Sequence, residues 1–392
     1  MTLQRLRFAL KTSSIVFALS LTACGGGGGT LPHGNGPNPP PAASLVEFVA
    51  PGSATVVTGA CGATCGTQAY ANNSLGAVVG SYTDANVVPH GFLRSTNGTV
   101  TSFDAPGAGL GAGLDEGTVA YGINTGGVIV GQFQDPSLVF HGFVRQPAGT
   151  FTTVNATGAG TGNYQGTLIY NVNTSGATAG VYYDGSNTEH GFVAAAGGAT
   201  TSFDPSGSAG TMVCEETCLN DTGTVTGFFL DANQVIHGFV RATGGAITQI
   251  DAPGAGSAAG SYTGTTAASI APDGSITGYL IDANGVAHGF VRTPGGTITP
   301  FDVPGAGTQA NQGTAAFSID SADSVTGEFI DSNGAMHGFT RSSAGVIATF
   351  NAQGAGTQGG QGTRPSTNNA QGAVTGWWID STGVNHGFVY TP

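Results

Sequence analysis

The sequence predicts an all-β fold of repeated four-stranded units, and three observations lead to this prediction. The phrase Asp-x5-His-Gly-Phe occurs seven times in 392 residues, and successive histidines lie 51, 49, 47, 51, 49 and 49 residues apart. Short runs rich in β-branched and aromatic residues flank each copy. Each period holds three short turn-like connections and one longer glycine-rich connection. Four-stranded units at this period are typical of a β-propeller, so we expect a seven-bladed β-propeller.

Residues 1–23 have the pattern of an export signal. Arg5, Arg7 and Lys11 precede an apolar segment at residues 15–21, which is too short to span a membrane as a helix. The signal runs into Leu-Thr-Ala-Cys24, which resembles a bacterial lipobox. That resemblance implies cleavage before Cys24, a lipid on that cysteine and, because Gly25 follows, sorting to the outer membrane. The alternative is an ordinary signal peptide with a chance cysteine.

Residues 24–43 are expected to form a lipid-anchored tether. A glycine run at residues 25–29 and prolines at positions 32, 37 and 39–41 leave no apolar periodicity that could support a core. The chain is therefore divided into a signal at 1–23, a tether at 24–43 and a repeat domain at 44–392.

The sixth unit illustrates the repeat. Its four strands are expected at residues 313–319, 324–330, 335–341 and 345–350. Residues 45–50 have the pattern of a fourth strand, whereas the last unit ends after its third strand near Tyr390. We therefore expect the N-terminal strand to complete the seventh unit, which would leave the ring without an open edge.

The Asp and His of each phrase are expected to face each other across a hairpin. In the fifth unit, Asn284-Gly is a strong hairpin-turn signal. This register would place Leu280 opposite Phe290 and Gly278 opposite Arg292, so that the bare glycine accommodates the arginine stem. A hydrogen-bonded Asp–His pair would then staple each hairpin. We assign this structural role to Asp84 and His90, Asp135 and His141, Asp184 and His190, Asp231 and His237, Asp282 and His288, Asp331 and His337, and Asp380 and His386.

Two other roles for these residues are considered. A carboxylate can orient an imidazole for base catalysis, but an active site is normally singular and this pair occurs seven times. The Asp-x-Asn-Gly turns that begin at Asp282 and Asp331 resemble half of a calcium loop, but the other carboxylates of such a loop are missing. A divalent cation is thus a weak alternative, and we assign no catalytic residue, cofactor or metal ligand.

The repeated pattern G-x-V-x-G…D…H-G-F-V-R resembles a bacterial extracellular repeat family that is named for its His-Ala-Phe tripeptide. The resemblance covers residues 45–392. This chain departs from the family in its central glycine, in the arginine that usually stands where the family often has tryptophan, and in its Phe-Asp-Ala-Pro-Gly-Ala-Gly connections. The resemblance implies the fold and an extracellular location, and it implies no particular activity.

The charge balance restricts the partners. Three of the nine Lys and Arg residues lie in the signal, which leaves six arginines against 22 acidic residues, a net charge of −16. Nucleic acid is excluded as a partner because its binding needs a basic stripe. Membrane contact is expected through the N-terminal lipid only. We expect a monomer with a glycan or protein ligand.

Four further cysteines form two closely spaced pairs, Cys61 with Cys65 and Cys214 with Cys218. Export would favour disulfides in both pairs. Cys214 and Cys218 align with an innermost strand, where residues four apart would be about 13 Å apart if extended. Either that strand is broken or the two thiols stay free.

Functional residues are sought where the repeat is broken. Trp377 occupies a variable position. Arg364 is the only mature arginine outside the His-Gly-Phe strands, and it is expected in the entry loop of the last unit. Acidic breaks occur at Glu215 and Glu216 and at Asp115 and Glu116, in loops expected to share one face with the Asp–His hairpins. These six residues are the candidate binding residues. The alternatives are packing between blades for Trp377 and solvated loop charges for the acids.

Two functions follow from these features. The first is an exported binding or scaffolding module, anchored at the outer membrane, that engages glycan or protein through its loop face. The alternative is a polysaccharide hydrolase or lyase with carboxylates and Arg364 in the central mouth. The repetition and the absence of a singular catalytic cluster in the sequence favour binding over catalysis.

Overall fold

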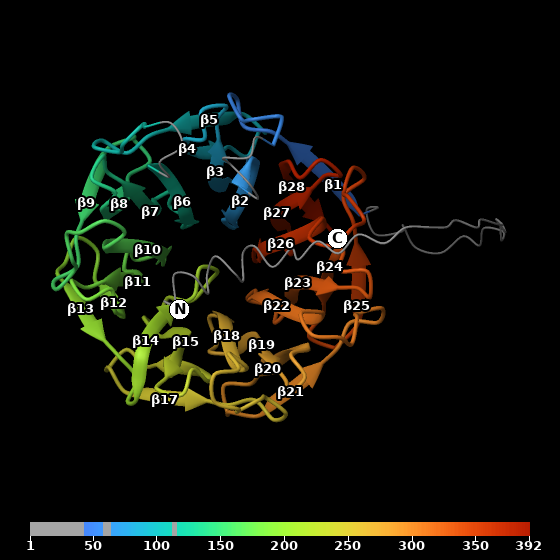
Figure 1. Ribbon diagram of the computed structural model, residues 1–392. Coiled ribbons are helices and arrows are strands. Elements are labelled where there is room, and N and C mark those ends of the chain that lie inside the picture. Colours follow the sequence, from blue (N-terminus) through green and yellow to red (C-terminus); the bar gives the residue numbers. More distant parts are fainter. Residues whose placement is uncertain (1–42, 58–63, 112–115) are drawn as a thin grey trace.

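The computed structural model describes residues 43–57, 64–111 and 116–392, and this part of the chain forms 28 β-strands and no α-helix. The strands are grouped in four-stranded units around a central axis, and the units follow one another around a ring (Figure 1). The expected all-β fold of repeated four-stranded units is confirmed. The expected signal and tether, with Cys24, lie outside the described residues. Across the described ranges, no helix is long and apolar enough to cross a membrane.

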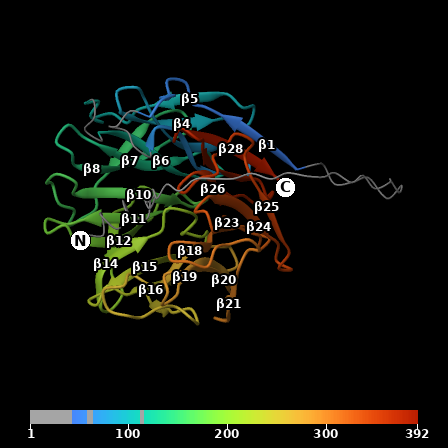
Figure 2. The ribbon, with the colours of Figure 1, turned by 45° about the vertical axis from the view of Figure 1, so that its right-hand side comes forward.

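Each unit runs from an inner strand at the axis to an outer strand at the rim (Figures 1 and 2). The first, innermost strands are β2 (Gly66–Asn72), β6 (Gly117–Ile123), β10 (Gly166–Val172), β14 (Ser208–Val213), β18 (Gly264–Ile270), β22 (Gly313–Ile319) and β26 (Gly362–Asn368). The second strands are β3 (Val78–Thr83), β7 (Ile129–Gln134), β11 (Thr178–Tyr183), β15 (Val225–Asp231), β19 (Ile276–Ile281), β23 (Val325–Ile330) and β27 (Val374–Ile379).

The third strands are β4 (Pro89–Arg94), β8 (Phe140–Arg145), β12 (Glu189–Ala194), β16 (Ile236–Arg241), β20 (Ala287–Arg292), β24 (Met336–Arg341) and β28 (Asn385–Thr391). The fourth, outermost strands are β5 (Val100–Phe103), β9 (Phe151–Val154), β13 (Thr200–Phe203), β17 (Ile247–Ile250), β21 (Ile298–Phe301), β25 (Ile347–Phe350) and, from the other end of the chain, β1 (Ser44–Phe48). Within each unit, neighbouring strands pair antiparallel.

The N-terminal strand completes the unit that the C-terminal strand leaves open. β1 pairs antiparallel with β28, from Ser44 opposite Thr391 to Phe48 opposite Gly387. This pairing is the one expected from residues 45–50.

Each inner strand begins beside the third strand of the preceding unit, as in the parallel contact of Gly66 with Asn385. Gly66 has a φ of +103°, and a side chain there would collide with the Asn385 carbonyl, so glycine is required at this approach. This pairing brings the turns between second and third strands to the same end of the ring as the long connections. We call that end the Asp–His face. The turns between first and second strands lie at the opposite end, which we call the amide face.

The expected hairpin register is wrong by two residues. Leu280 pairs with His288 and Gly278 with Phe290. The reason is a tighter turn, because the Asp282 N–H donates to the Val286 carbonyl (2.9 Å) and Gly285 has a φ of +80°. Asp282 therefore opposes Val286 rather than His288. Gly278 makes room for the Phe290 ring, 3.0 Å from where a β-carbon would lie, and not for an arginine.

The core lies in the contacts between successive units. The phenylalanines of all seven His-Gly-Phe phrases are fully buried. The arginine that ends most third strands packs across the seam onto a ring in the outer strand of the preceding unit. Its Cζ lies 5.2 Å from the Phe48 centroid for Arg94, 4.8 Å from Phe103 for Arg145, 4.9 Å from Phe203 for Arg241 and 4.9 Å from Phe301 for Arg341. Arginine and phenylalanine thus join neighbouring units.

Candidate functional site

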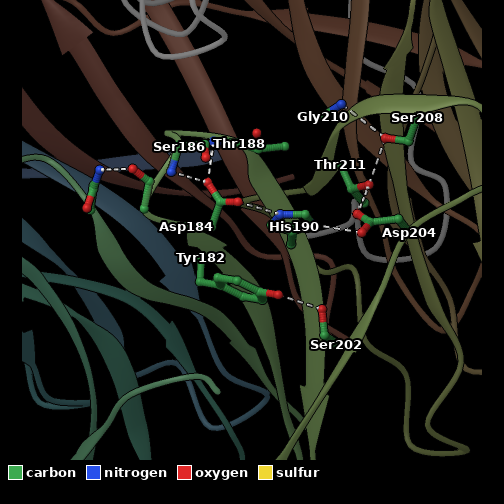
Figure 3. A network of polar contacts seen from close by, with 12 residues as sticks. Tyr182, Asp184, Ser186, Thr188, His190, Ser202, Asp204, Ser208, Gly210 and Thr211 are labelled. Atoms are coloured by element: carbon green, nitrogen blue, oxygen red, sulfur yellow. Dashed lines mark hydrogen bonds and ion pairs between the residues drawn. The ribbon is translucent and has the colours of Figure 1, made fainter. Parts of the chain in front are cut away.

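In the described part of the chain, six of the seven histidines of the Asp–His face, all except His386, have a second partner that was not expected from the sequence. In the third unit, His190 Nδ1 contacts Asp204 at 2.7 Å, and Asp184 lies on the other side of the ring (Figure 3). The second partner always lies 14 residues after its histidine, where the outer strand ends. These partners are Asp104, Asn155, Asp204, Asp251, Asp302 and Asn351. The recurrence of Phe-Asp at this spacing was the signal that could have revealed them.

The distance between the histidine Nε2 and the first carboxylate depends on whether the second partner is aspartate or asparagine. Where the second partner is aspartate, the histidine Nε2 lies 3.8, 3.5, 3.8 and 3.9 Å from the first carboxylate. Where it is asparagine, as for His141 and His337, the distances are 3.2 and 3.3 Å. A charged acceptor makes the stronger hydrogen bond and draws the imidazole toward itself. The hydrogen bond to Asp104 also raises the pKa of His90, against the lowering effect of burial.

The first carboxylate mainly caps its turn. Asp282 Oδ1 accepts the N–H groups of Asn284 (2.8 Å) and Val286 (2.9 Å), and the same pattern recurs in the other units. The histidine rings stack on the large residue two before the Asp, as His337 does on Phe329 at 4.7 Å. In the described ranges, no group of three or more His, Cys, Asp or Glu side chains could hold a metal ion. These contacts are those of a structural element that is repeated in every unit.

The inner strands surround a cavity of about 300 Å³ that opens at the amide face. Its rim carries a belt of asparagines, and each donates its amide to a backbone carbonyl of the next unit. The belt runs from Asn73 to Asn124 (3.0 Å), from Asn124 to Asn173 (2.9 Å), from Asn173 to Asn220 (3.2 Å) and from Asn369 to Asn73 (2.9 Å). Ala271 and Asp320 take the corresponding positions in the remaining two units. Burial raises the pKa of Asp320, although the backbone N–H groups of Ser324 and Ala322 oppose this.

Arg364 and Trp377 are brought together on the first two strands of the last unit, outside the residues that line the cavity. Arg364 was expected in a loop, but it is the third residue of β26, where it pairs with Trp377 of β27. The guanidinium carbon lies 5.2 Å from the Trp377 ring and 5.6 Å from the Phe317 ring of the preceding unit. Trp377 contacts Tyr70 of the next unit at 5.6 Å between centroids, so the expected alternative of packing between blades describes part of its environment. An aromatic row continues from Tyr70 to Tyr121 at 5.4 Å.

Glu215 and Glu216 were expected in a loop of the Asp–His face, but they do not lie there. They follow β14, where a disulfide between Cys214 and Cys218 brings the two Cα atoms to 5.7 Å and interrupts the inner strand. The broken-strand alternative for this pair is therefore correct. The interruption places Glu216 and Thr217 in the cavity lining. Cys65 is also disulfide-bonded, and its expected partner Cys61 lies outside the described residues.

A buried tyrosine connects Glu216 electrostatically with Arg364. Burial raises the pKa of Tyr279 to about 12, the Glu216 charge adds to the rise, and Arg364 opposes it. Glu328 of β23 lies 3.8 Å from Arg364 Nε. Burial raises the pKa of Glu328, and Arg364 opposes this effect too. Of the candidate residues, Glu216 thus lines the cavity, whereas Arg364 and Trp377 lie on the inner and second strands of the last unit.

Glu116 does not join these residues. Glu116 is buried at 4 % exposure and accepts the Gly111 N–H at 2.8 Å, so it is not the solvated loop charge that was the alternative for it. Gln165 and Gln312 make the same contact in their units, which indicates a structural role. Asp115 lies outside the described residues.

A ring of four-stranded antiparallel units around a central channel defines the β-propeller class. No protein-family model matches the chain, and no curated protein matches it. Among solved structures, the lectin BP39L from Burkholderia pseudomallei aligns with a TM-score of 0.51 at 12% identity, over 81% of this chain and 94% of the lectin. This likeness shows a shared fold.

Two other solved structures align less closely. A puromycin hydrolase aligns with a TM-score of 0.49 at 12% identity, over 87% of this chain and 56% of the hydrolase. The chain thus spans about half the length of that enzyme. A lectin from Aleuria aurantia, described as a six-bladed β-propeller with a fucose recognition mode, aligns with a TM-score of 0.39 at 13% identity, over 70% of this chain and 90% of the lectin.

Proposed function

We propose that this chain is a glycan-binding β-propeller whose ligand site is the central channel. The observation that carries the proposal is the cavity of about 300 Å³, which lies at the lower end of the range for small-molecule sites. Its lining combines the side chains that hydroxylated sugar rings need, with amides at Asn124 and Asn173, a hydroxyl at Thr217, a carboxylate at Glu216 and an aromatic ring at Tyr121. The fold shared with a lectin supports the same assignment.

The proposed propeller has seven blades, and β1 closes the ring. The seven His-Gly-Phe phrases and the 28 strands support this number. Contacts between the two ends of the chain support closure, because Asn369 of the last unit donates to the Asn73 carbonyl of the first at 2.9 Å. We also propose that the units belong to the His-Ala-Phe repeat family, on the pattern that they share with it.

The proposed site of action is the outer membrane, through a lipid on Cys24 and the tether at residues 24–43. The lipobox-like sequence supports this proposal. Cys24→Ser is expected to release the protein from membranes and to abolish labelling by a fatty-acid probe. Equal labelling of both forms would exclude the lipid anchor.

The binding proposal is tested with full-length protein in detergent on an array of neutral and acidic glycans. We expect saturable binding of at least one glycan. Thr217→Trp should abolish it by filling the cavity. Leu75→Trp is the matched control, because Leu75 lies in a turn of the same face, is 64% exposed and is not part of the lining.

The outcomes separate the alternatives. Binding that survives Thr217→Trp would place the site elsewhere. An array without any bound glycan would reject the proposed function. Release of shorter products from a bound polysaccharide would establish the enzyme alternative instead.

A further inference from the structure

We infer that the channel selects acidic sugars, with Arg364 receiving the carboxylate of a uronic acid. This inference rests on the proposed glycan-binding function and adds the class of ligand. It comes from the exceptional position of one arginine, from the way in which its guanidinium is held, and from the groups that surround it.

Arg364 is the one arginine on an inner strand among the residues that the structure describes, and the aromatic row of Trp377, Tyr70 and Tyr121 connects it with the cavity lining. This part of the chain contains no lysine, and its other five arginines end third strands. Three of those arginines donate Nη1 to the carbonyl of the next residue, at 3.5 Å for Arg241, 3.4 Å for Arg292 and 3.4 Å for Arg341. Within the described ranges, the terminal nitrogens of Arg364 make no such bond. They remain available to a ligand.

The guanidinium of Arg364 is fixed in place before any ligand arrives. Phe317 and Trp377, from neighbouring units, hold its carbon at 5.6 and 5.2 Å from their ring centres. Its side chain is still 24% exposed. A fixed planar guanidinium with both terminal nitrogens free matches the two oxygens of a carboxylate, which it can bind in parallel.

The neighbouring acid does not satisfy this arginine. Glu328 Oε2 lies 3.8 Å from Nε, which exceeds hydrogen-bond length, and no hydrogen bond to that oxygen is formed within the described part of the chain. Burial raises the pKa of Glu328 and so favours its uncharged form. An external carboxylate would therefore supply the missing charge-assisted partner.

The surroundings of Arg364 suit a sugar rather than a simple anion. Trp377 and Tyr70 offer partly exposed aromatic rings for the apolar faces of a sugar. Tyr70 donates its hydroxyl to Gln68 Oε1 at 2.8 Å, which adds an amide and a hydroxyl to this wall. Glu216, nearer the amide face, adds a carboxylate to the cavity lining. A uronic acid is a sugar that carries both a carboxylate, which Arg364 would bind, and hydroxyl groups for the polar side chains.

The test compares three trisaccharides by isothermal titration of the full-length protein in detergent. The probes are trigalacturonic acid, its methyl ester, and neutral maltotriose. The acid is expected to bind at least about ten-fold more tightly than the ester or maltotriose, as for loss of one charge-assisted pair. Arg364→Gln should lose this preference, whereas Arg364→Lys, which keeps the charge but not the planar fork, should retain part of it. Arg341→Gln is the matched control and should bind as the wild type does.

Each result supports or overturns the inference. Equal affinity of the wild-type protein for the acid and its ester would overturn the selectivity, and the proposed glycan binding would stand. An undiminished preference in Arg364→Gln would overturn the role of this residue. If no glycan binds in either experiment, the proposed function and the inference both fall. Melting curves of the variants show that they are folded, and the comparison of acid with ester needs no variant.

Discussion

At the scale of single residues, six of the seven histidines of the Asp–His face are held between two acceptors from different parts of their unit. His288 illustrates the arrangement, with Nδ1 2.8 Å from Asp302 and Nε2 3.9 Å from Asp282. The short contact joins the third strand to the end of the outer strand. The long contact joins the histidine to a turn that Asp282 already stabilises by accepting two backbone N–H groups. The second acceptor therefore contributes more to the role of the histidine than the first.

His288→Ala should lower the free energy of unfolding by about 0.5–1.5 kcal/mol, the usual contribution of one hydrogen bond. Denaturant unfolding measures the loss. His237→Ala is the matched variant, because His237 also lies between two aspartates, Asp231 and Asp251. It should lose a similar amount of unfolding free energy. If either substitution abolished glycan binding without loss of stability, that histidine would belong to a functional site.

Asp380 should make stability depend on pH in the acid range. Burial alone would raise the pKa of Asp380, but hydrogen bonds from the Thr382 hydroxyl, His386 and two backbone N–H groups lower it to about 2. Because the pKa of Asp380 in the folded protein lies below its ordinary value of 3.8, the stabilisation is complete above about pH 4 and is lost as the pH falls toward 2.

The comparison variant is Asp380→Asn. Its deficit in unfolding free energy relative to the wild type should be largest near pH 6 and should shrink as the pH falls toward 2.5. The other turn aspartates are common to both proteins and cancel in the difference. A deficit that stayed constant over this range would show that the charge of Asp380 contributes nothing.

At the scale of elements, the side-chain contacts between neighbouring units explain why the residue near the end of the third strand differs from unit to unit. Arg94, Arg145, Arg241 and Arg341 each lie over a phenylalanine of the preceding outer strand. Tyr390 replaces arginine in the last unit and stacks on Phe350 at 3.9 Å between centroids. The third unit has Ala194 at this position, and the outer strand before it ends in Val154. A ring on one outer strand is thus accompanied by a cation or a ring on the next third strand, and Arg292, which follows Ile250, is a cation without such a ring.

Arg341→Ala should cost about 0.5–1 kcal/mol more in unfolding free energy than Arg292→Ala, the contribution of a cation–π contact. The two arginines occupy equivalent positions and make the same Nη1 bond, but the outer strand before Arg292 ends in Ile250, which has no ring. In a Phe301→Leu background the difference should disappear. Equal losses in the original background would refute the cation–π account of the seams.

The strands were predictable from the sequence, but the pairing of their side chains was not. Residues 313–319 were expected as a strand and are one, because glycine turns and β-branched runs mark the ends locally. The predicted register was wrong because the three-residue turn, with Gly285 at positive φ, shifts every residue pair of the hairpin by two. The contacts of the arginines were predicted wrongly because each contact joins residues of two different repeats, and no pattern within one repeat reveals it.

At the scale of the whole molecule, the ring depends on a strand from the far end of the chain. β1 supplies Phe48, which contacts Phe92 at 5.7 Å between centroids and carries Arg94 over its ring, so it joins the last unit to the first. Ala50 adds a hydrogen bond to Thr67 at 2.9 Å. Loss of β1 would expose one edge of β28 and open this seam.

Deletion of residues 44–50 should therefore lower the melting temperature of the whole domain and the yield of monomer. Deletion of seven tether residues, 34–40, is the control of equal length and should change neither. The measurements are thermal unfolding and size-exclusion chromatography of both proteins. A strand deletion as stable and monomeric as the tether deletion would show that β1 does not close the ring.

The candidate site was predictable only where it departs from the repeat. Trp377 and Arg364 stand out because no other unit has these residues at these positions. The asparagine belt did not stand out, because Asn73, Asn124 and Asn173 recur with the repeat and look structural in sequence. Nor could the sequence show that the disulfide at Cys214 turns Glu216 into the cavity. Three-dimensional proximity at the axis, rather than residue identity, assembles this site.

The account separates a repeated scaffold from a channel that binds glycan. The chain has two tryptophans, Trp377 beside the Arg364 guanidinium and Trp378, which is buried against His386 at 4.1 Å. Titration of the full-length protein with a glycan bound on the array, followed by tryptophan fluorescence, therefore reports on the surroundings of Arg364. We predict a saturable change in emission that is lost in Trp377→Phe while the melting temperature is retained. Glycan binding without a change in emission, or a change that persists in Trp377→Phe, would contradict the account.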